Sequence, residues 1–127
     1  MQKLRRWRFG EQLETRCLLA SQPIISEFVA DNDDSLLDAV GESPDWIEIF
    51  NPGGESIDLN GWHLTDDRSN LQKWSFPEVE VAAGGFQIVF ASGQNNTDAQ
   101  GNLHANFRLA ADGDYLGLVK PDGETIV

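Results

Sequence analysis

The chain has 127 residues, the length of one typical domain, and its 9 Lys and Arg residues against 21 Asp and Glu residues give a net charge of −12. A folded part with this much negative charge repels the phosphate backbone of nucleic acids, which argues against DNA or RNA as its partner. One cysteine leaves no intrachain disulfide and no thiolate zinc cluster, and no apolar run approaches the roughly 18 residues of a membrane-spanning helix.

Residues 1–22 differ in charge from the rest of the chain. The first twenty positions hold five basic and two acidic residues, a net charge of +3, whereas the remainder holds four basic and nineteen acidic residues, a net charge of −15. Basic residues followed by the short apolar stretch 17–20 have the layout of a secretory signal, although that stretch is shorter than the roughly 7–15 residues usual for one. A short amphipathic helix is the alternative interpretation.

After residue 22 the expected elements are short strands joined by turns. β-branched and aromatic side chains predict a strand over residues 24–30, which the polar run 31–34 ends. Residues 35–40 allow no more than a brief helical turn, because Gly41 and Pro44 follow them.

Residues 45–50 predict the clearest strand. Alternation places Ile47 and Ile49 on one face, and the opposite face holds Trp46, Glu48 and Phe50. The turn Asn51-Pro-Gly-Gly54 closes this strand.

The second half of the body predicts several further strands. Residues 56–59 and 62–65 are expected to pair around Asn60-Gly61, a dipeptide that tolerates the positive φ of a tight hairpin turn. Residues 92–103 form the longest polar connection and are expected to be an exposed loop. The other predicted strands are residues 73–76, 86–91, 105–109 and 115–119, of which 86–91 is apolar enough to be central.

These elements predict an all-β fold. Short strands with turn signals about every 8–12 residues, and no long helix, are typical of an antiparallel β-sandwich or barrel, and we favour the sandwich. A last strand is only beginning at residues 124–127, so we expect this chain to be the N-terminal piece of a longer polypeptide, with its domain truncated at the C-terminal end.

The stretch Glu11-Gln-Leu-Glu-Thr-Arg-Cys-Leu-Leu-Ala20 resembles an N-terminal export address of large surface and secreted proteins of some bacteria. This resemblance implies an exported protein whose basic leader, residues 1–22, is removed. The domain would then comprise residues 23–127.

Seven blocks of the body resemble the lamin tail domain and follow its order. The most specific are residues 25–28 (Ile-Ser-Glu-Phe), 45–52 (Asp-Trp-Ile-Glu-Ile-Phe-Asn-Pro) and 57–66 (Ile-Asp-Leu-Asn-Gly-Trp-His-Leu-Thr-Asp), and the others are residues 74–77, 82–85, 104–109 and 113–116. The resemblance covers residues 23–127 and implies an immunoglobulin-like β-sandwich. That family occurs in nuclear lamins and, in bacteria, beside hydrolases, nucleases or adhesion-like regions of exported proteins.

The residues that carry these blocks are interpreted as structural. The large amphipathic tryptophans are expected to cap or fill the sandwich, each burying on the order of 150–250 Å². Gly61 supplies the geometry of a turn, and Asn51 and Asn106 are expected to form hydrogen bonds with loop backbone beside strands. This structural motif comprises Trp46, Glu48, Asn51, Gly61, Trp62, Trp74 and Asn106.

The candidate sites are few. The sequence holds no Gly-x-Ser-x-Gly elbow, phosphate-binding glycine loop or His-Glu-x-x-His pair, so no enzyme activity is expected of this segment. His63 and His104 could each be a ligand, but a histidine bonded within the fold is favoured. Calcium is the one cofactor considered, because it binds six to eight oxygens, and a solvated turn is the competing interpretation. The candidate ligands are Asp31, Asn32, Asp33 and Asp34, and the pairs Asp66-Asp67 and Asp112-x-Asp114 add further carboxylates at strand ends.

Together these observations predict a non-catalytic interaction or spacer module of a secreted or cell-surface bacterial protein. Its partner would be a protein or a glycan, and no nucleic acid. The alternative is an N-terminal accessory domain of a larger extracellular enzyme, a hydrolase or nuclease, whose catalytic part lies beyond residue 127.

Overall fold

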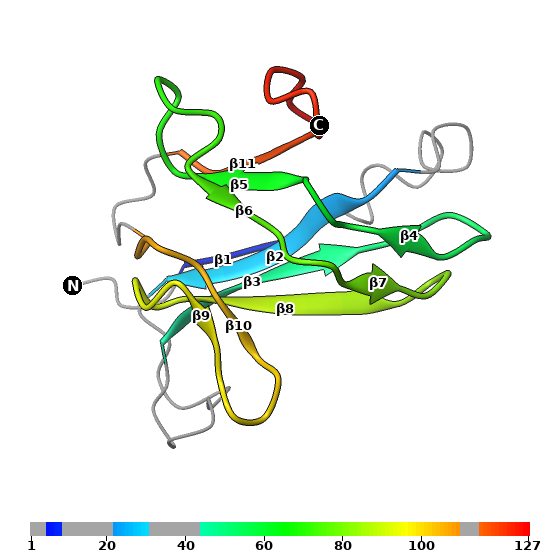
Figure 1. Cartoon of the computed structure of the whole chain (residues 1–127), viewed down its shortest axis with the longest axis horizontal. Helices are drawn as coiled ribbons and strands as arrows, with labels where there is room; N and C mark the ends of the chain where they lie inside the picture. Colours follow the sequence, from blue (N-terminus) through cyan, green and yellow to red (C-terminus); the bar gives the residue numbers. More distant parts are fainter. Residues whose placement is uncertain (1–4, 9–21, 31–43, 110–114) are drawn as a thin grey trace.

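A computed structural model of the chain describes residues 5–8, 22–30, 44–109 and 115–127, and these form eleven strands and no helix (Figure 1). The described part therefore also contains no helix long and apolar enough to cross a membrane. The strands are β1 (Arg5–Arg8), β2 (Ile24–Ala30), β3 (Asp45–Phe50), β4 (Ile57–Asp58), β5 (His63–Thr65), β6 (Trp74–Ser75), β7 (Glu80–Val81), β8 (Phe86–Ala91), β9 (Asn96–Thr97), β10 (Leu103–His104) and β11 (Gly117–Val119).

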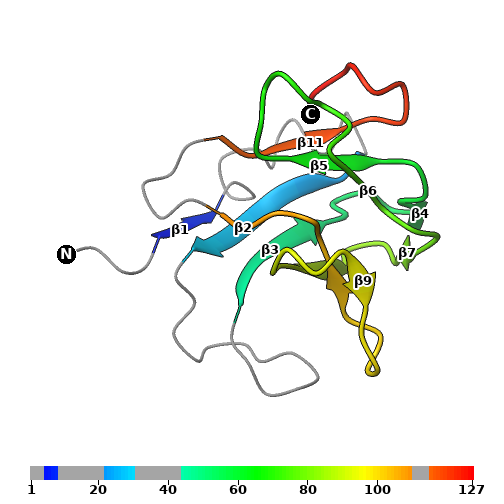
Figure 2. The same cartoon turned by 60° about the vertical axis from the view of Figure 1, so that its left-hand side comes forward.

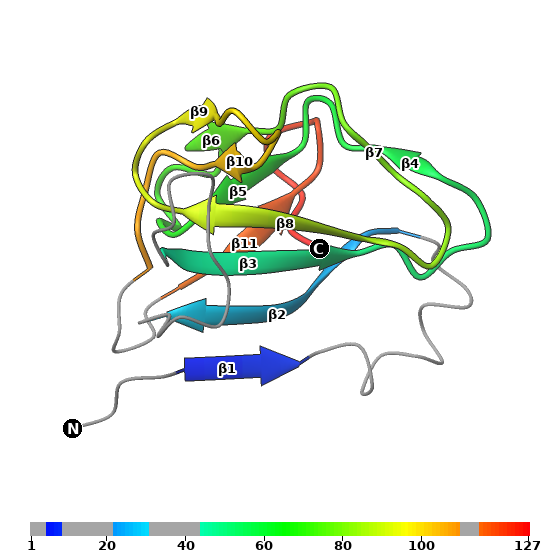
Figure 3. The same ribbon diagram turned by 90° about the horizontal axis from the view of Figure 1, so that it is seen from below.

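The largest sheet has six strands in the order β1-β2-β3-β8-β10-β9. Figure 3 shows β1 at its outer edge, followed by β2, β3 and β8. β8 lies between β3 and β10, which confirms the prediction that residues 86–91 form a central strand. β8 and β10 run parallel, whereas the other strand pairs of this sheet are antiparallel, as predicted.

A second sheet, β11-β5-β6, lies over the inner face of the first (Figures 1 and 2). The predicted alternation of β3 is confirmed, because Ile47 and Ile49 belong to the main core while Trp46 lies on the opposite face. The second sheet contributes Leu64, Leu118 and Trp74 to the same core. Each of these buried side chains is worth roughly 1.5–3 kcal/mol relative to an exposed one, so the two sheets are held together chiefly by this layer.

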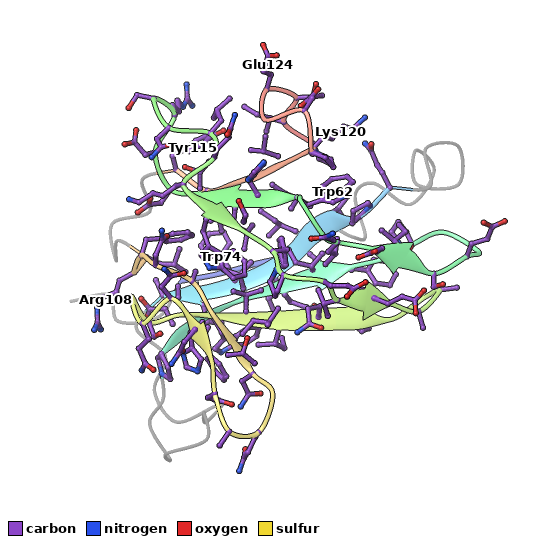
Figure 4. All side chains as sticks on the ribbon, viewed as in Figure 1. Trp62, Trp74, Arg108, Tyr115, Lys120 and Glu124 are labelled. Carbon is purple, nitrogen blue, oxygen red and sulfur yellow. The ribbon has the colours of Figure 1, made fainter. Side chains whose placement is uncertain are left out.

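The tryptophans occupy three different environments. Trp74 is buried between the sheets, and Trp62 is half-buried against the same core (Figure 4). Trp46 instead packs against Val29 and Phe90 on the outer face of the six-stranded sheet. Trp46 therefore does not fill the space between the sheets, because a residue preceding Ile47 in a strand must face the other way.

The expected hairpin around Asn60-Gly61 is wrong. β4 pairs with β7, whereas β5 pairs with β6 and β11, so the strands flanking the dipeptide do not pair with each other. Gly61 has φ of 86°, but Asn60 is not among the residues with positive φ. A type I′ hairpin turn needs positive φ at both central residues, whereas a glycine alone at the second position is typical of a type II turn. The backbone N–H of Trp62 donates to the carbonyl of Leu59 across this turn.

Two predictions for the chain after β8 need correction. The expected loop 92–103 contains β9 and the first residue of β10, and these two strands form an antiparallel hairpin. Residues 105–109 form no regular strand, and only Arg108 makes an isolated bridge, to Ser92. The hairpin satisfies backbone groups that a long open loop would leave to water. The helical turn expected at residues 35–40 lies outside the described residues.

Candidate functional site

Three polar side chains line up along the β9–β10 hairpin, from Ser92 before β9 to Asp98 at the start of the connecting turn. His104 Nδ1 lies 2.7 Å from Ser92 Oγ, and His104 Nε2 lies 3.0 Å from Asp98 Oδ2. The parallel pairing of β10 with β8 places His104 beside Phe90, and their rings stack with centroids 5.3 Å apart. These residue types are also those of a serine hydrolase triad.

The arrangement is structural and not catalytic. Ser92 is 3% exposed and His104 is 1% exposed, so a substrate carbonyl cannot reach the hydroxyl. Ser92 Oγ also accepts the backbone N–H of Gln94 at 3.2 Å, which fixes the turn after β8. A nucleophile must touch the atom that it attacks, and this hydroxyl is instead enclosed and fully engaged within the fold.

Asp98 anchors the tip of the hairpin. Its carboxylate accepts the backbone N–H groups of Gln100 and Asn102 at 3.0 and 2.9 Å, in addition to the side chains of Asn102 and His104. Burial raises the pKa of this carboxyl, but the hydrogen bonds from His104, Asn102 and Gln100 outweigh burial and hold the pKa below its ordinary value. Sequence reasoning missed Ser92 and Asp98, although Asp98 and Gly101 at the ends of a four-residue turn are a recognisable turn signal.

The other histidine is also bonded within the fold. His63 is buried in β5, and its Nδ1 lies 2.8 Å from Ser75 Oγ. Burial lowers the pKa of His63, and the carboxylate of Asp122 partly opposes this effect. Among the described residues, no three His, Cys, Asp or Glu side chains gather as metal ligands would.

The calcium candidates Asp31, Asn32, Asp33 and Asp34 lie outside the described residues, as do Asp112 and Asp114. Of the further acidic pair, Asp66 accepts Lys73 Nζ at 2.8 Å and Asp67 accepts the backbone N–H of Ser69 at 2.9 Å. These carboxylates are therefore engaged by the loop that they belong to and by Lys73. A calcium site in residues 31–34 stays a prediction.

The two asparagines of the structural motif bond loop backbone. The side chain of Asn51 is fully buried, and its Nδ2 donates to the carbonyls of Glu55 at 2.7 Å and Val81 at 3.0 Å. Its Oδ1 accepts the backbone N–H of Gly53 at 3.0 Å. Asn106 is exposed and donates one bond, to the carbonyl of Lys73 at 2.8 Å. Asn51 thus ties the turn after β3 to the strand β7.

Glu48 lies on the outer face of the six-stranded sheet. The register of β2 against β3 shifts between Ile25 and Glu27, which is a β-bulge at Ser26. The Ser26 hydroxyl donates to Glu48 Oε1 at 2.7 Å. The bulge therefore supplies a hydrogen-bond donor to a half-buried carboxylate.

An apolar surface lies on the outer face, at the end of the sheet where β8 begins. Phe50 and Phe86 are partners across β3 and β8, and their rings stack with centroids 4.8 Å apart. Phe86 is 56% exposed, the largest value among the exposed large hydrophobic residues of the described chain. Half-buried Ile88 follows on the same face. We call these three residues the Phe86 patch.

The chain segments that flank Phe50 and Phe86 in sequence are acidic. The segments 48–58 and 78–88 carry this end of the molecule and hold no Lys or Arg, and their acidic residues are Glu48, Glu55, Asp58, Glu78 and Glu80. All but Glu48 are exposed. Arg108, by contrast, lies at the opposite end from β4 and β7 (Figure 4).

The model of the Lamin Tail Domain family matches residues 20–127. The chain belongs to the lamin tail domain family. This membership confirms the resemblance of the body and the predicted immunoglobulin-like fold, and the family is a non-catalytic one. No curated protein and no solved structure matches the chain. Membership in a non-catalytic family agrees with a structural role for the hydrogen bonds that join Ser92, His104 and Asp98.

Proposed function

We propose that this lamin tail domain is a non-catalytic protein-interaction module of a secreted or cell-surface bacterial protein, and that the Phe86 patch is its contact surface. The observation that carries the proposal is the exposure of Phe86, 56%, at a position stacked on Phe50. Contiguous exposed apolar patches are uncommon on soluble domains and often mark interaction sites. Aromatic side chains at the centre of a patch with a polar rim are typical of protein interfaces.

The charge around the patch indicates the chemistry of the partner. Glu55 and Glu80 are exposed, and they belong to the chain segments that flank Phe50 and Phe86 and hold no Lys or Arg. A partner segment that carries Arg or Lys beside an apolar side chain would satisfy both features, since a cation also binds favourably over an aromatic face. We therefore expect a basic protein segment, bound less tightly as salt is added.

The test compares two glutamate substitutions at exposed apolar residues. Phe86→Glu adds a charge to the patch, whereas Ile126→Glu adds the same charge at a residue that is 47% exposed and bridges to Val119 of β11 in the second sheet. Tagged wild-type and variant chains are incubated with envelope proteins of the producing cells, and any retained protein is purified and titrated against each chain. Loss of a hot-spot contact at the centre of an interface costs at least about 2 kcal/mol, or about 30-fold in affinity.

We expect Phe86→Glu to weaken binding by about that factor, and Ile126→Glu to leave it within about twofold. Binding should also fall between low and physiological salt. Equal binding by Phe86→Glu and the wild type, measured on the purified pair, would remove the Phe86 patch from the proposal.

Export of the protein is supported by the leader alone. The basic start and the stretch 11–20 favour secretion and removal of residues 1–22. Separation of the producing cells into cytosolic, membrane and secreted fractions tests this, with N-terminal sequencing of the recovered protein. We expect an exported chain that begins after residue 22, and an intact chain confined to the cytosol would contradict export.

A further inference from the structure

The outermost strand of the six-stranded sheet comes from the leader. β1 pairs antiparallel with β2, in a register that places Arg5 opposite Ala30 and Arg8 opposite Glu27 (Figure 3). The family match begins at residue 20, so β1 lies outside the part of the chain that defines the family. The main core is built from residues between Ile25 and Leu118. β1 therefore adds to the edge of a sheet whose own domain starts later.

Without β1, β2 would be the edge of the sheet, and it has little protection of its own. β2 has seven residues, Ile-Ile-Ser-Glu-Phe-Val-Ala, with no Lys and no Pro among them. Natural edge strands are usually short, or carry charges, prolines or bulges that prevent pairing with another chain. The bulge at Ser26 and the single charge of Glu27 are the only such devices in β2. An edge of this kind readily accepts an added strand.

We propose that the β2 edge is a strand-addition site, closed within the chain by residues 5–8 and available to a basic extended segment of a partner protein once the leader is gone. The proposal rests on the leader removal stated under the proposed function. The chemistry of the occupant follows from the strand that now fills the site. Three of the four residues of β1 are arginines, Arg8 stands in register with Glu27, and residues 21–127 carry −15. Backbone bonds along β2 give affinity, and the charges select a cationic strand.

The experiment uses the full chain and a fluorescein-labelled peptide of residues 1–10. In the wild-type chain, residues 5–8 compete from within at an effective concentration on the order of millimolar. Arg6→Pro combined with Trp7→Pro removes two successive backbone N–H groups of β1, so it removes the ladder donor whichever of the two residues supplies it. Arg6→Ala with Trp7→Ala is the matched control, since it keeps both N–H groups.

We expect fluorescence anisotropy to show that the proline variant binds the peptide at least about tenfold more tightly than the wild type or the alanine variant does. A scrambled peptide of the same composition should bind the proline variant at least about tenfold more weakly. If the proline variant is unfolded by circular dichroism, adding the peptide should restore the β-sheet signal, because a ligand of the folded state stabilises it.

Three outcomes would overturn the proposal. The first is no peptide binding by the folded proline variant, or no recovery of an unfolded one, at about 1 mM peptide. The second is equal binding of the scrambled peptide, which would reduce the effect to attraction between opposite charges. The third is a concentration-dependent dimer of the proline variant that excludes the peptide, which would make a second copy the occupant. Phe86→Glu should not change peptide binding, so this experiment and the test of the Phe86 patch fail independently.

Discussion

Replacing Asn51 with aspartate is expected to lower the free energy of unfolding by at least about 3 kcal/mol. The Asn51 amide nitrogen donates to the carbonyls of Glu55, Val81 and Ala82 from a fully buried position. Aspartate has the same shape but no donor, so it removes these three hydrogen bonds and brings a negative charge towards the carbonyl oxygens. An uncompensated buried charge is among the most destabilising single changes.

Asn106→Asp is the matched control for this change. Asn106 is exposed and donates a single bond, to the carbonyl of Lys73, so its loss should cost about 1 kcal/mol or less. Urea unfolding at pH 7, followed by tryptophan fluorescence, gives the free energy of unfolding of each variant and of the wild type from the midpoint and slope of the transition. A loss of less than about 1 kcal/mol for Asn51→Asp would contradict the anchoring role of Asn51.

His104→Phe is the second change for which we expect a large effect, about 2–3 kcal/mol at pH 7. Phenylalanine keeps an aromatic ring against Phe90 but removes both bonds of the imidazole, so the buried Ser92 hydroxyl and the Asp98 carboxylate each lose one hydrogen bond. His63→Phe is the control, because its bond goes to the exposed Ser75 and should be worth about 1 kcal/mol or less.

The same variant should change the acid stability of the domain. The pKa of Asp98 in the folded state lies below the ordinary value of 3.8, so the unfolded state binds the proton more readily. This carboxylate therefore stabilises the fold at pH above 3.8, and that contribution is lost as the pH falls from 3.8 towards the lower folded pKa. Without the His104 bond the folded pKa rises towards its ordinary value, so the contribution shrinks.

Urea midpoints measured at intervals from pH 7 down to pH 2 test this expectation. Other carboxyls also titrate there, such as Asp122, whose pKa is lowered to about 2 by hydrogen bonds from the Thr125 hydroxyl and from the backbone N–H groups of Glu124 and Thr125. The difference in stability between His104→Phe and the wild type at each pH isolates the contribution of Asp98. We expect that difference to narrow as the pH falls below about 4, and a constant difference would show that the His104–Asp98 bond does not set the pKa.

Much of the framework follows from the sequence because it depends on local rules. Alternation in residues 45–50 places Ile47 and Ile49 in the core whatever the neighbouring strands are, since successive side chains in a strand face opposite ways. The order of short strands and turns, with the seven family blocks, predicts the all-β immunoglobulin-like fold. The polar Asn51 at the end of an apolar strand similarly predicts a side chain that bonds the loop after it.

Strand pairing depends on the tertiary structure, and the pairing predicted around Asn60-Gly61 was wrong. Asn60-Gly61 is compatible with a hairpin turn and with a type II turn, and the choice depends on which partners the flanking strands find. β4 pairs with β7, and β5 pairs with β6 and β11, and the paired residues are 10 or more positions apart in the sequence. The line of Ser92, His104 and Asp98 likewise forms only because β10 returns parallel to β8.

The sequence by itself determined that this is a small acidic all-β domain of the lamin tail type behind a basic segment, because composition, alternation and block order are properties of the chain. Only the tertiary structure decided which parts of that domain face water. Phe86 and Phe90 lie on the same face of β8, yet one is 56% exposed and the other 1%, because Trp46 and His104 pack on Phe90. Periodicity cannot distinguish these positions, since it reports the face of a strand and not what covers that face.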